Sequence, residues 1–173
     1  AGHISDIGCG YGFMSYQLHF AAPGRDITGY DYDQEKISVA NHCFSRDEGI
    51  RFKEADVSRF VPEASDAFIM ADVLHYLEPA QQMELLEKCM ERLNPGGVLL
   101  IRDGDRDLEK RHSGTMLTEY FSTRFFSFNK TTHEKLYFLS GNGIRELAAR
   151  KNMHCRTIDP SKYTSNIIFV ITH

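Results

Sequence analysis

Three glycines and an aspartate near the start of the sequence form a motif that suits a bound ligand. Residues 3–7 are a short, mainly apolar run, and Gly8, Gly10 and Gly12 follow at alternate positions. Glycine lets the backbone approach another group closely and adopts conformations that side chains forbid. Asp6 lies just before the glycines, and a carboxylate is unfavourable beside a pyrophosphate but favourable beside an ammonium group. The motif therefore favours a ligand with a positive group and no phosphate.

The spacing of these glycines differs from that of the dinucleotide-binding fingerprint. That fingerprint reads G-x-G-x-x-G, and Phe13 occupies the position where its third glycine would stand. Phe13 therefore argues against a nicotinamide-dependent oxidoreductase, which stays an alternative for a chain of this pattern. A simpler alternative is that Gly10 and Gly12 only form a tight turn, with no ligand beside them.

The motif lies within an alternation of apolar runs and amphipathic segments, which predict strands and helices respectively. We expect strands at residues 3–7, 26–30, 50–54, 66–71, 98–102, 155–158 and 166–172, and helices at residues 13–21, 34–44, 79–93 and 143–151. Strands that alternate with helices form a mainly parallel sheet. A short loop joins the last two strands, so we expect those two to pair antiparallel.

Acidic residues follow two further predicted strands. Asp31 ends the second strand, and Asp56 follows the third. Ligands of open α/β sheets bind at the carboxyl ends of the strands, so these carboxylates are expected near the glycines. Each has a structural alternative. Asp31 could cap the next helix, although Asp33 is better placed to do so, and Asp56 could cap the turn at 57–60.

Five motifs together resemble those of class I S-adenosylmethionine-dependent methyltransferases. The resemblance extends over almost the whole chain, and the motifs occur in the family's order and at its spacing. They are DIGCGYG (6–12), GYDYD (29–33), EAD (54–56), ADVLHYL (71–77) and LNPGGVLLI (93–101). The resemblance implies a doubly wound, Rossmann-like α/β fold, with a mostly parallel seven-stranded sheet whose last strand is antiparallel.

The resemblance also implies residues that bind S-adenosylmethionine, with no metal ion. Asp6 and the carbonyl groups near Ala71 suit the ammonium group of this cofactor. Asp31 suits the ribose diol, which donates two hydrogen bonds, and Asp56 suits the adenine amino group. Asp72 could equally be a residue at the start of a helix. The full expected set is Asp6, Gly8, Gly10, Gly12, Asp31, Tyr32, Asp56, Ala71 and Asp72, with Phe13, Met70 and Val73 as apolar walls.

His75 is the first candidate for a catalytic base. Methyl transfer from a sulfonium requires an acceptor held close and in line, and a hydroxyl acceptor must also lose a proton. A histidine titrates near neutral pH and suits that task. His75 follows the fourth strand, at the edge where the methyl group is expected, and Tyr76 is its neighbour.

Segment 105–139 interrupts the alternation of strands and helices. We expect it to be inserted over the acceptor, with His112 and Tyr120 as substrate contacts. Arg102 leaves the fifth strand at the same edge and is a third candidate contact. The aromatic residues at 120–128 have a plainer interpretation as packing within the segment.

Composition limits the partners and the compartment. The 173 residues carry a net charge of -4, with a pI of about 6.1, which argues against a nucleic-acid partner. No apolar run approaches the roughly 20 residues of a membrane span. Four widely spaced cysteines predict free thiols in a reducing compartment, so we expect a cytoplasmic location. We expect residues 1–173 to form a single methyltransferase-like domain, a piece of a longer chain fused to another domain.

The sequence therefore predicts an enzyme that transfers a methyl group from S-adenosylmethionine to a small-molecule or lipid-like acceptor, at oxygen. One alternative is a non-enzymatic module that keeps the fold and binds a partner. Another is an NAD(P)-dependent oxidoreductase. A nucleic-acid methyltransferase is a weaker alternative, because the fourth strand leads into Ala71-Asp72-Val73-Leu74 rather than an Asn/Asp-Pro-Pro-aromatic motif.

Overall fold

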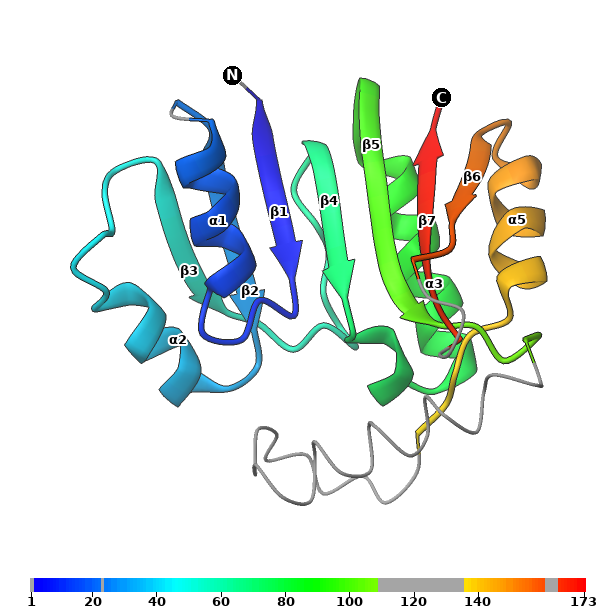
Figure 1. Ribbon diagram of the computed structural model, residues 1–173, viewed down its shortest axis with the longest axis horizontal. Helices are drawn as coiled ribbons and strands as arrows, with labels where there is room; N and C mark the ends of the chain where they lie inside the picture. The colour runs from blue at the N-terminus through cyan, green and yellow to red at the C-terminus, as the bar shows by residue number, and fades with distance from the viewer. Residues whose placement is uncertain (1, 23, 109–135, 161–164) are drawn as a thin grey trace.

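A single mixed sheet with the strand order β3-β2-β1-β4-β5-β7-β6 forms the centre of the molecule (Figure 1). The computed structural model describes residues 2–22, 24–108, 136–160 and 165–173. Strands β1 to β5 are parallel, and β7 is antiparallel to both of its neighbours. The strands are β1 (His3–Ile7), β2 (Asp26–Asp31), β3 (Ile50–Glu54), β4 (Ser65–Ala71), β5 (Leu93–Gly104), β6 (His154–Ile158) and β7 (Asn166–Thr172). The predicted seven-stranded α/β sheet with an antiparallel last strand is confirmed.

Helices cover both faces of this sheet, as a doubly wound fold requires. Figure 1 shows α1 and α2 on the near side and α3 behind β5 and β7. Tyr16 of α1 and Ile37 of α2 share a buried cluster with Ile27 of β2. Leu86 of α3 and Leu147 of α5 belong to a second cluster. The helices are α1 (Phe13–Ala21), α2 (Gln34–Asn41), α3 (Pro79–Glu91) and α5 (Gly141–Arg150), with a 3-10 turn, η1 (Leu74–Tyr76), after β4.

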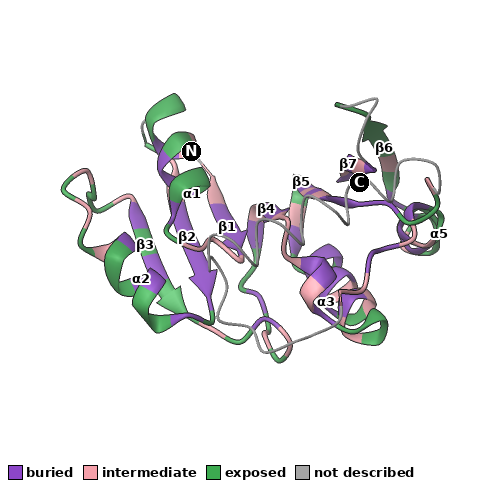
Figure 2. Cartoon of the chain, turned by 60° about the horizontal axis from the view of Figure 1, so that its bottom comes forward, coloured by how far each residue is buried: buried purple, intermediate pink, exposed green. Residues whose placement is uncertain are grey.

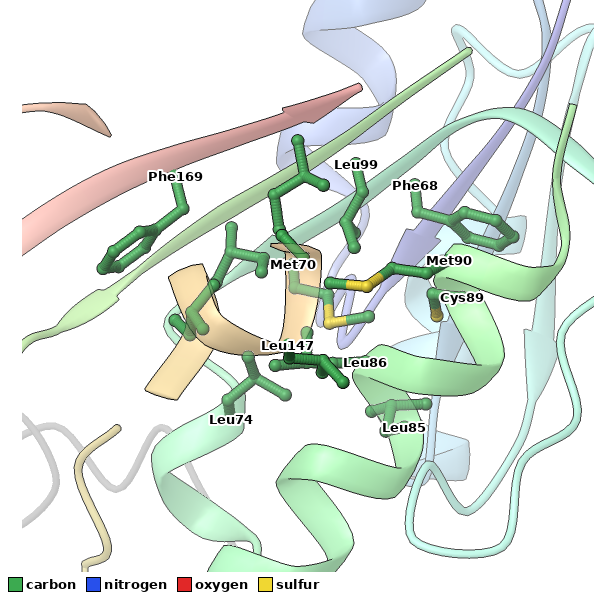
Figure 3. Packing of buried hydrophobic residues seen from close by; sticks show 14 of the residues in the cluster. Phe68, Met70, Leu74, Leu85, Leu86, Cys89, Met90, Leu99, Leu147 and Phe169 are labelled. Carbon is green, nitrogen blue, oxygen red and sulfur yellow. The ribbon is translucent and has the colours of Figure 1, made fainter. Parts of the chain in front are cut away.

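The larger cluster forms the core beneath α3 and α5 (Figure 3). Phe68, Leu99 and Phe169 enter it from three neighbouring strands and have no exposed surface. Met70, expected as a wall of the ligand site, packs in this core and is 1% exposed. Figure 2 colours the chain by burial. Strands β1 and β2 are mostly buried, and the outer surfaces of α1 and α2 are exposed.

The largest differences between predicted and observed boundaries are the start of β5 and the end of α2. Strand β5 was expected to begin at residue 98 but begins at Leu93. Gly96 adopts a φ of 76°, and the pairing with β4 shifts register between Ser65 and Ala67. This irregularity lets the strand continue through a Pro-Gly-Gly sequence that normally ends one. Helix α2 stops at Asn41 rather than 44, and Phe44 beyond it is fully exposed, so no buried contact extends the helix.

The order of the strands creates a switch point between β1 and β4. From β1 the chain proceeds through β2 to β3 on one side, whereas β4 leads to β5 on the other. Ligands of open α/β sheets bind at the carboxyl ends of the strands at such a point. The loop after β1, the end of β2 and the turn after β4 all lie at this edge (Figure 1).

Two further findings bear on the expectations from composition. None of the described helices is long and apolar enough to cross a membrane. All four cysteines of the chain, Cys9, Cys43, Cys89 and Cys155, are free thiols.

The buried core provides a direct test of the fold. Phe169→Ala should lower the free energy of unfolding by about 3–5 kcal/mol, because it leaves a cavity beneath α3 and α5. Phe44 is fully exposed, so Phe44→Ala is a matched control and should change that free energy by less than about 0.5 kcal/mol. Urea denaturation followed by far-UV circular dichroism measures both variants. Equal effects of the two substitutions would contradict this packing.

Candidate functional site

The glycine loop after β1 has one face that is open. Gly8, Gly10 and Gly12 all have φ between 55° and 80°, a region that favours glycine. A Cβ atom at Gly8 would collide with Val73, and one at Gly12 would collide with the ring of Phe52. A Cβ atom at Gly10 would meet nothing within 4 Å among the described residues. The outer two glycines therefore serve the packing of the protein itself, and Gly10 leaves room for a ligand.

Asp31 ties this loop to the end of β2. One of its carboxylate oxygens accepts a hydrogen bond from the backbone N–H of Gly10 at 2.8 Å. The other accepts from the N–H of Asp33 at 2.9 Å. Asp33, not Asp31, caps α2, through contacts with the N–H groups of Glu35 and Lys36. Each oxygen of Asp31 keeps a second lone pair, so this 6% exposed carboxylate can also accept hydrogen bonds from a diol.

Asp6 is a carboxylate buried at the end of β1. It is 2% exposed and accepts a hydrogen bond from Ser15 Oγ of α1 at 2.5 Å. Burial raises the pKa of the Asp6 carboxyl to about 6, partly offset by the Ser15 hydrogen bonds, and the negative charge of Asp31 raises it further. Two buried carboxylates beside an open backbone face favour a cation and disfavour a pyrophosphate.

Asp56 and Tyr32 lie at the outer side of this edge. Asp56 is exposed and accepts hydrogen bonds from the N–H and the hydroxyl of Ser58, at 2.9 Å and 2.7 Å. The Ser58 hydroxyl is the largest cause that lowers the pKa of Asp56. The capping alternative for Asp56 is therefore confirmed, and its contact with adenine stays a prediction. Tyr32 is 40% exposed.

The end of β4 is fixed by an ion pair to β5. Ala71 is the last residue of β4 and pairs with Arg102 in the sheet. Asp72 follows with a φ of 55°, which is uncommon for a residue with a side chain. Its carboxylate pairs with the Arg102 guanidinium, and its N–H donates to the Arg102 carbonyl at 2.8 Å. These contacts hold Asp72 and Arg102 against each other, and their expected ligand contacts stay predictions.

His75 lies in the turn η1, which is far from the glycine loop in sequence but near it in space. Val73, two residues before it, is the residue that packs against Gly8. His75 Nδ1 lies 2.8 Å from Asp103 Oδ1, and both side chains are 1% exposed. The rings of Tyr76 and Phe138 lie 4.2 Å and 5.5 Å from the imidazole, centroid to centroid. A histidine whose Nδ1 donates to a carboxylate presents Nε2 as a proton acceptor.

Some predicted residues cannot be placed, and some positioning residues were not foreseen. His112 and Tyr120, like most of segment 105–139, lie outside the described residues. Ser15 and Asp103 were not assigned as the partners of Asp6 and His75. The contact of Asp103 with His75 could have been inferred from the neighbouring ends of β4 and β5. The register that pairs Ala71 with Arg102 brings Asp103 beside η1. Among the described residues no group of three or more His, Cys, Asp or Glu could hold a metal ion.

Comparisons with known proteins agree with this arrangement. A family model described as a methyltransferase domain matches residues 4–97, more than half of the chain. This chain belongs to the methyltransferase family. The match includes the glycine loop, the acids at the ends of β1 and β2, and the turn that carries His75.

The relatives of this methyltransferase domain act on small molecules, as their names state. It is 27% identical over 153 residues to human acetylserotonin O-methyltransferase, covering 86% of this chain and 44% of that protein. It is 30% identical over 112 residues to trans-aconitate 2-methyltransferase of Rhizobium meliloti (strain 1021), covering 65% and 42%. The chain therefore spans less than half the length of these relatives. The crystal structure of human N-acetylserotonin methyltransferase in complex with SAM superimposes with a TM-score of 0.70 at 23% identity, covering 98% of this chain and 47% of that one.

The raised pKa of Asp6 predicts how binding of a cationic ligand depends on pH. S-adenosylhomocysteine carries an ammonium group, which prefers the ionised carboxylate, so its affinity should fall as pH drops through 6. Between pH 7.5 and pH 5 its Kd should rise about tenfold, measured by isothermal titration calorimetry. Asp6→Asn removes the titrating group and should bind more weakly, with a Kd that is flat over this range. A flat profile for the unmodified protein would contradict an ammonium contact at Asp6.

The role of Asp31 predicts a loss of affinity for the same ligand. Asp31→Ala removes the acceptor expected to face the ribose, and it should weaken binding of S-adenosylhomocysteine by about 1.5–3 kcal/mol. Asp33→Ala removes the cap of α2 but no expected ligand contact, so it should change thermal stability more than affinity. Unchanged affinity in Asp31→Ala would assign that carboxylate a structural role only.

Proposed function

We propose that this methyltransferase domain transfers the methyl group of S-adenosylmethionine to an oxygen atom of a small-molecule or lipid-like acceptor. The observation that carries the proposal is the open face of Gly10, which binds the buried Asp31 carboxylate and follows the buried Asp6 at the end of β1. Membership of the family and the reactions named for its relatives support methyl transfer. The acidic pI and the small-molecule names of the relatives favour such an acceptor over nucleic acid.

The residues at this edge fit the parts of the cofactor. We assign Asp6 to the ammonium group, because burial raises the pKa of its carboxyl and a nearby cation would favour the ionised form. We assign Asp31 to the ribose hydroxyls, because its carboxylate holds Gly10 and keeps free lone pairs. We assign four more residues to the cofactor because they lie at or just after the ends of β2, β3 and β4. They are Tyr32, Asp56, Ala71 and Asp72. When bound, the cofactor supplies an activated methyl group on a sulfonium.

His75 is the proposed base. Asp103 orients its ring through Nδ1, so Nε2 is the nitrogen that takes the proton from an acceptor hydroxyl. The contact of Val73 with Gly8 keeps this turn beside the cofactor loop. Because the ring is buried, an acceptor that meets it is itself shielded from water. We further propose that segment 105–139 covers the acceptor, with Tyr76, Arg102, His112 and Tyr120 as candidate contacts.

We also propose a cytoplasmic location and a place within a longer protein. Four free thiols in one chain are typical of a reducing compartment. The relatives are more than twice the length of the segment that matches this chain, which supports fusion to another domain.

Radiolabelled methyl transfer tests the activity. The protein should bind S-adenosylhomocysteine and transfer methyl groups from S-adenosylmethionine to members of a panel of small hydroxylated and carboxylic compounds, including N-acetylserotonin and trans-aconitate. Absence of binding at millimolar S-adenosylhomocysteine would contradict the proposal. Binding without transfer to any acceptor would favour the non-enzymatic module, and binding of NADH instead would favour the oxidoreductase.

Substitution of His75 tests the proposed base on whichever acceptor the panel identifies. His75→Ala should lower kcat by about 100-fold or more, with the Kd of S-adenosylhomocysteine changed less than about twofold, because the ring faces the acceptor rather than the cofactor. His154 lies exposed on edge strand β6, so His154→Ala is the matched control and should keep full turnover. Full turnover in His75→Ala would mean that another group, or none, removes the proton.

A further inference from the structure

Gln82 is a buried amide on a helix face that is otherwise apolar. It lies on α3, is 2% exposed, and is followed on the same helix by the core residues Leu85, Leu86 and Cys89. Its Nε2 donates to the carbonyl of Leu74 at 2.9 Å and to that of Leu77 at 2.9 Å. Burying an amide is costly unless it is hydrogen-bonded. The side chain of Gln82 is therefore fixed against the carbonyls of Leu74 and Leu77.

The same amide also reaches a distant part of the chain. Gln82 Nε2 contacts the carbonyl of Tyr137, on the segment that returns toward α5. Leu74 and Leu77 are the first residue of η1 and the residue after it. One side chain therefore joins the turn that carries His75 to the described end of segment 105–139. An apolar residue in its place would leave these three carbonyls without the two amide N–H donors that they share.

Further contacts fix the same two segments around His75. The Tyr137 N–H donates to the His75 carbonyl at 2.8 Å, and the Phe138 ring stacks at 5.5 Å from the imidazole. The backbone N–H of His75 contacts Asp103 Oδ2 at 3.2 Å, and Nδ1 lies 2.8 Å from Oδ1. The orientation of the imidazole thus depends on β5, on η1 and on the returning segment, and Gln82 connects the last two.

We propose that Gln82 is a positioning residue for methyl transfer. By holding η1 against residues 137–139, it keeps His75 with Nδ1 donating to Asp103 and Nε2 directed to act as the acceptor of a proton. Gln82 acts only through His75 and touches neither substrate nor cofactor. The inference rests on the proposed function, in which His75 is the base.

Two neighbouring glutamines on α3 give a matched pair of variants. Gln82→Met removes the buried donors and keeps a side chain of similar length. Gln81→Met on the next residue removes only the capping-box contact, in which Gln81 Oε1 accepts from the N–H of Glu78 at 3.1 Å. Both substitutions perturb the start of α3, but only the first disconnects η1 from the returning segment.

The experiment measures the tautomer of His75 and turnover in parallel. Long-range 1H–15N correlation spectra of uniformly 15N-labelled protein should show the Nδ1–H form of His75 in the unmodified protein and in Gln81→Met, and a mixture of forms in Gln82→Met. With the acceptor that the panel identifies, kcat of Gln82→Met should fall about tenfold or more, with the Kd of S-adenosylhomocysteine within about twofold. Gln81→Met should keep kcat within about twofold, whatever it does to the melting temperature.

Three outcomes would overturn the inference. The first is a His75 in the Nε2–H form in the unmodified protein, a result that needs no variant to fold. The second is a Gln82→Met variant that folds and retains both the tautomer and kcat. The third is a pair of variants that lose kcat equally, which would make the effect one of helix stability.

One further variant and one further outcome complete the test. If Gln82→Met does not fold, Gln82→Asn keeps the amide but shortens its reach, and the same loss of tautomer and kcat is expected. Failure of the unmodified protein to bind S-adenosylhomocysteine would contradict the proposed function, whereas the tautomer spectra would still decide whether Gln82 positions His75.

Discussion

The candidate site depends on one buried carboxylate. Asp31 ends β2 and accepts hydrogen bonds from the N–H of Gly10 with one oxygen and from that of Asp33 with the other. The first contact fixes the glycine loop after β1, and the second fixes the start of α2. Hydrogen bonds to a charged acceptor are stronger than those between neutral groups. The carboxylate that would bind a ribose is thus also the one that shapes the surface on which the ligand would lie.

The charges around this carboxylate select the kind of ligand. Asp6 and Asp31 are both nearly inaccessible to solvent, and the charge of Asp31 adds to the cost of ionising Asp6. A cation relieves that cost, whereas a phosphate adds to it. This explains why a loop that resembles a phosphate-binding turn in its glycine content would serve a ligand with an ammonium and a sulfonium group. The glycines at its two ends are needed to admit Val73 and Phe52 rather than the ligand.

The sequence predicted where the strands lie along the chain because most are apolar runs bounded by turn residues, and their alternation with helices predicted a mainly parallel sheet. The spatial order of the strands was not predicted. It also predicted Asp33 as the cap of α2 and left the capping role of Asp56 open, since both roles need only local spacing. It did not predict the early start of β5, which depends on a register shift at Ser65. It likewise missed Ser15, Asp103 and Gln82 as partners, because these contacts join elements distant in sequence and leave no periodic pattern. The ion pair of Asp72 and Arg102 was missed for the same reason.

A crystal structure with S-adenosylhomocysteine bound tests the central claim most directly, namely that the edge between β1 and β4 holds this nucleoside. The account predicts its ammonium nitrogen within hydrogen-bond distance of Asp6, its ribose hydroxyls on Asp31, and its amino-acid portion passing over Gly10. A structure in which the nucleoside lies elsewhere, or in which a side chain of the protein covers Gly10 and no nucleoside enters, would contradict it.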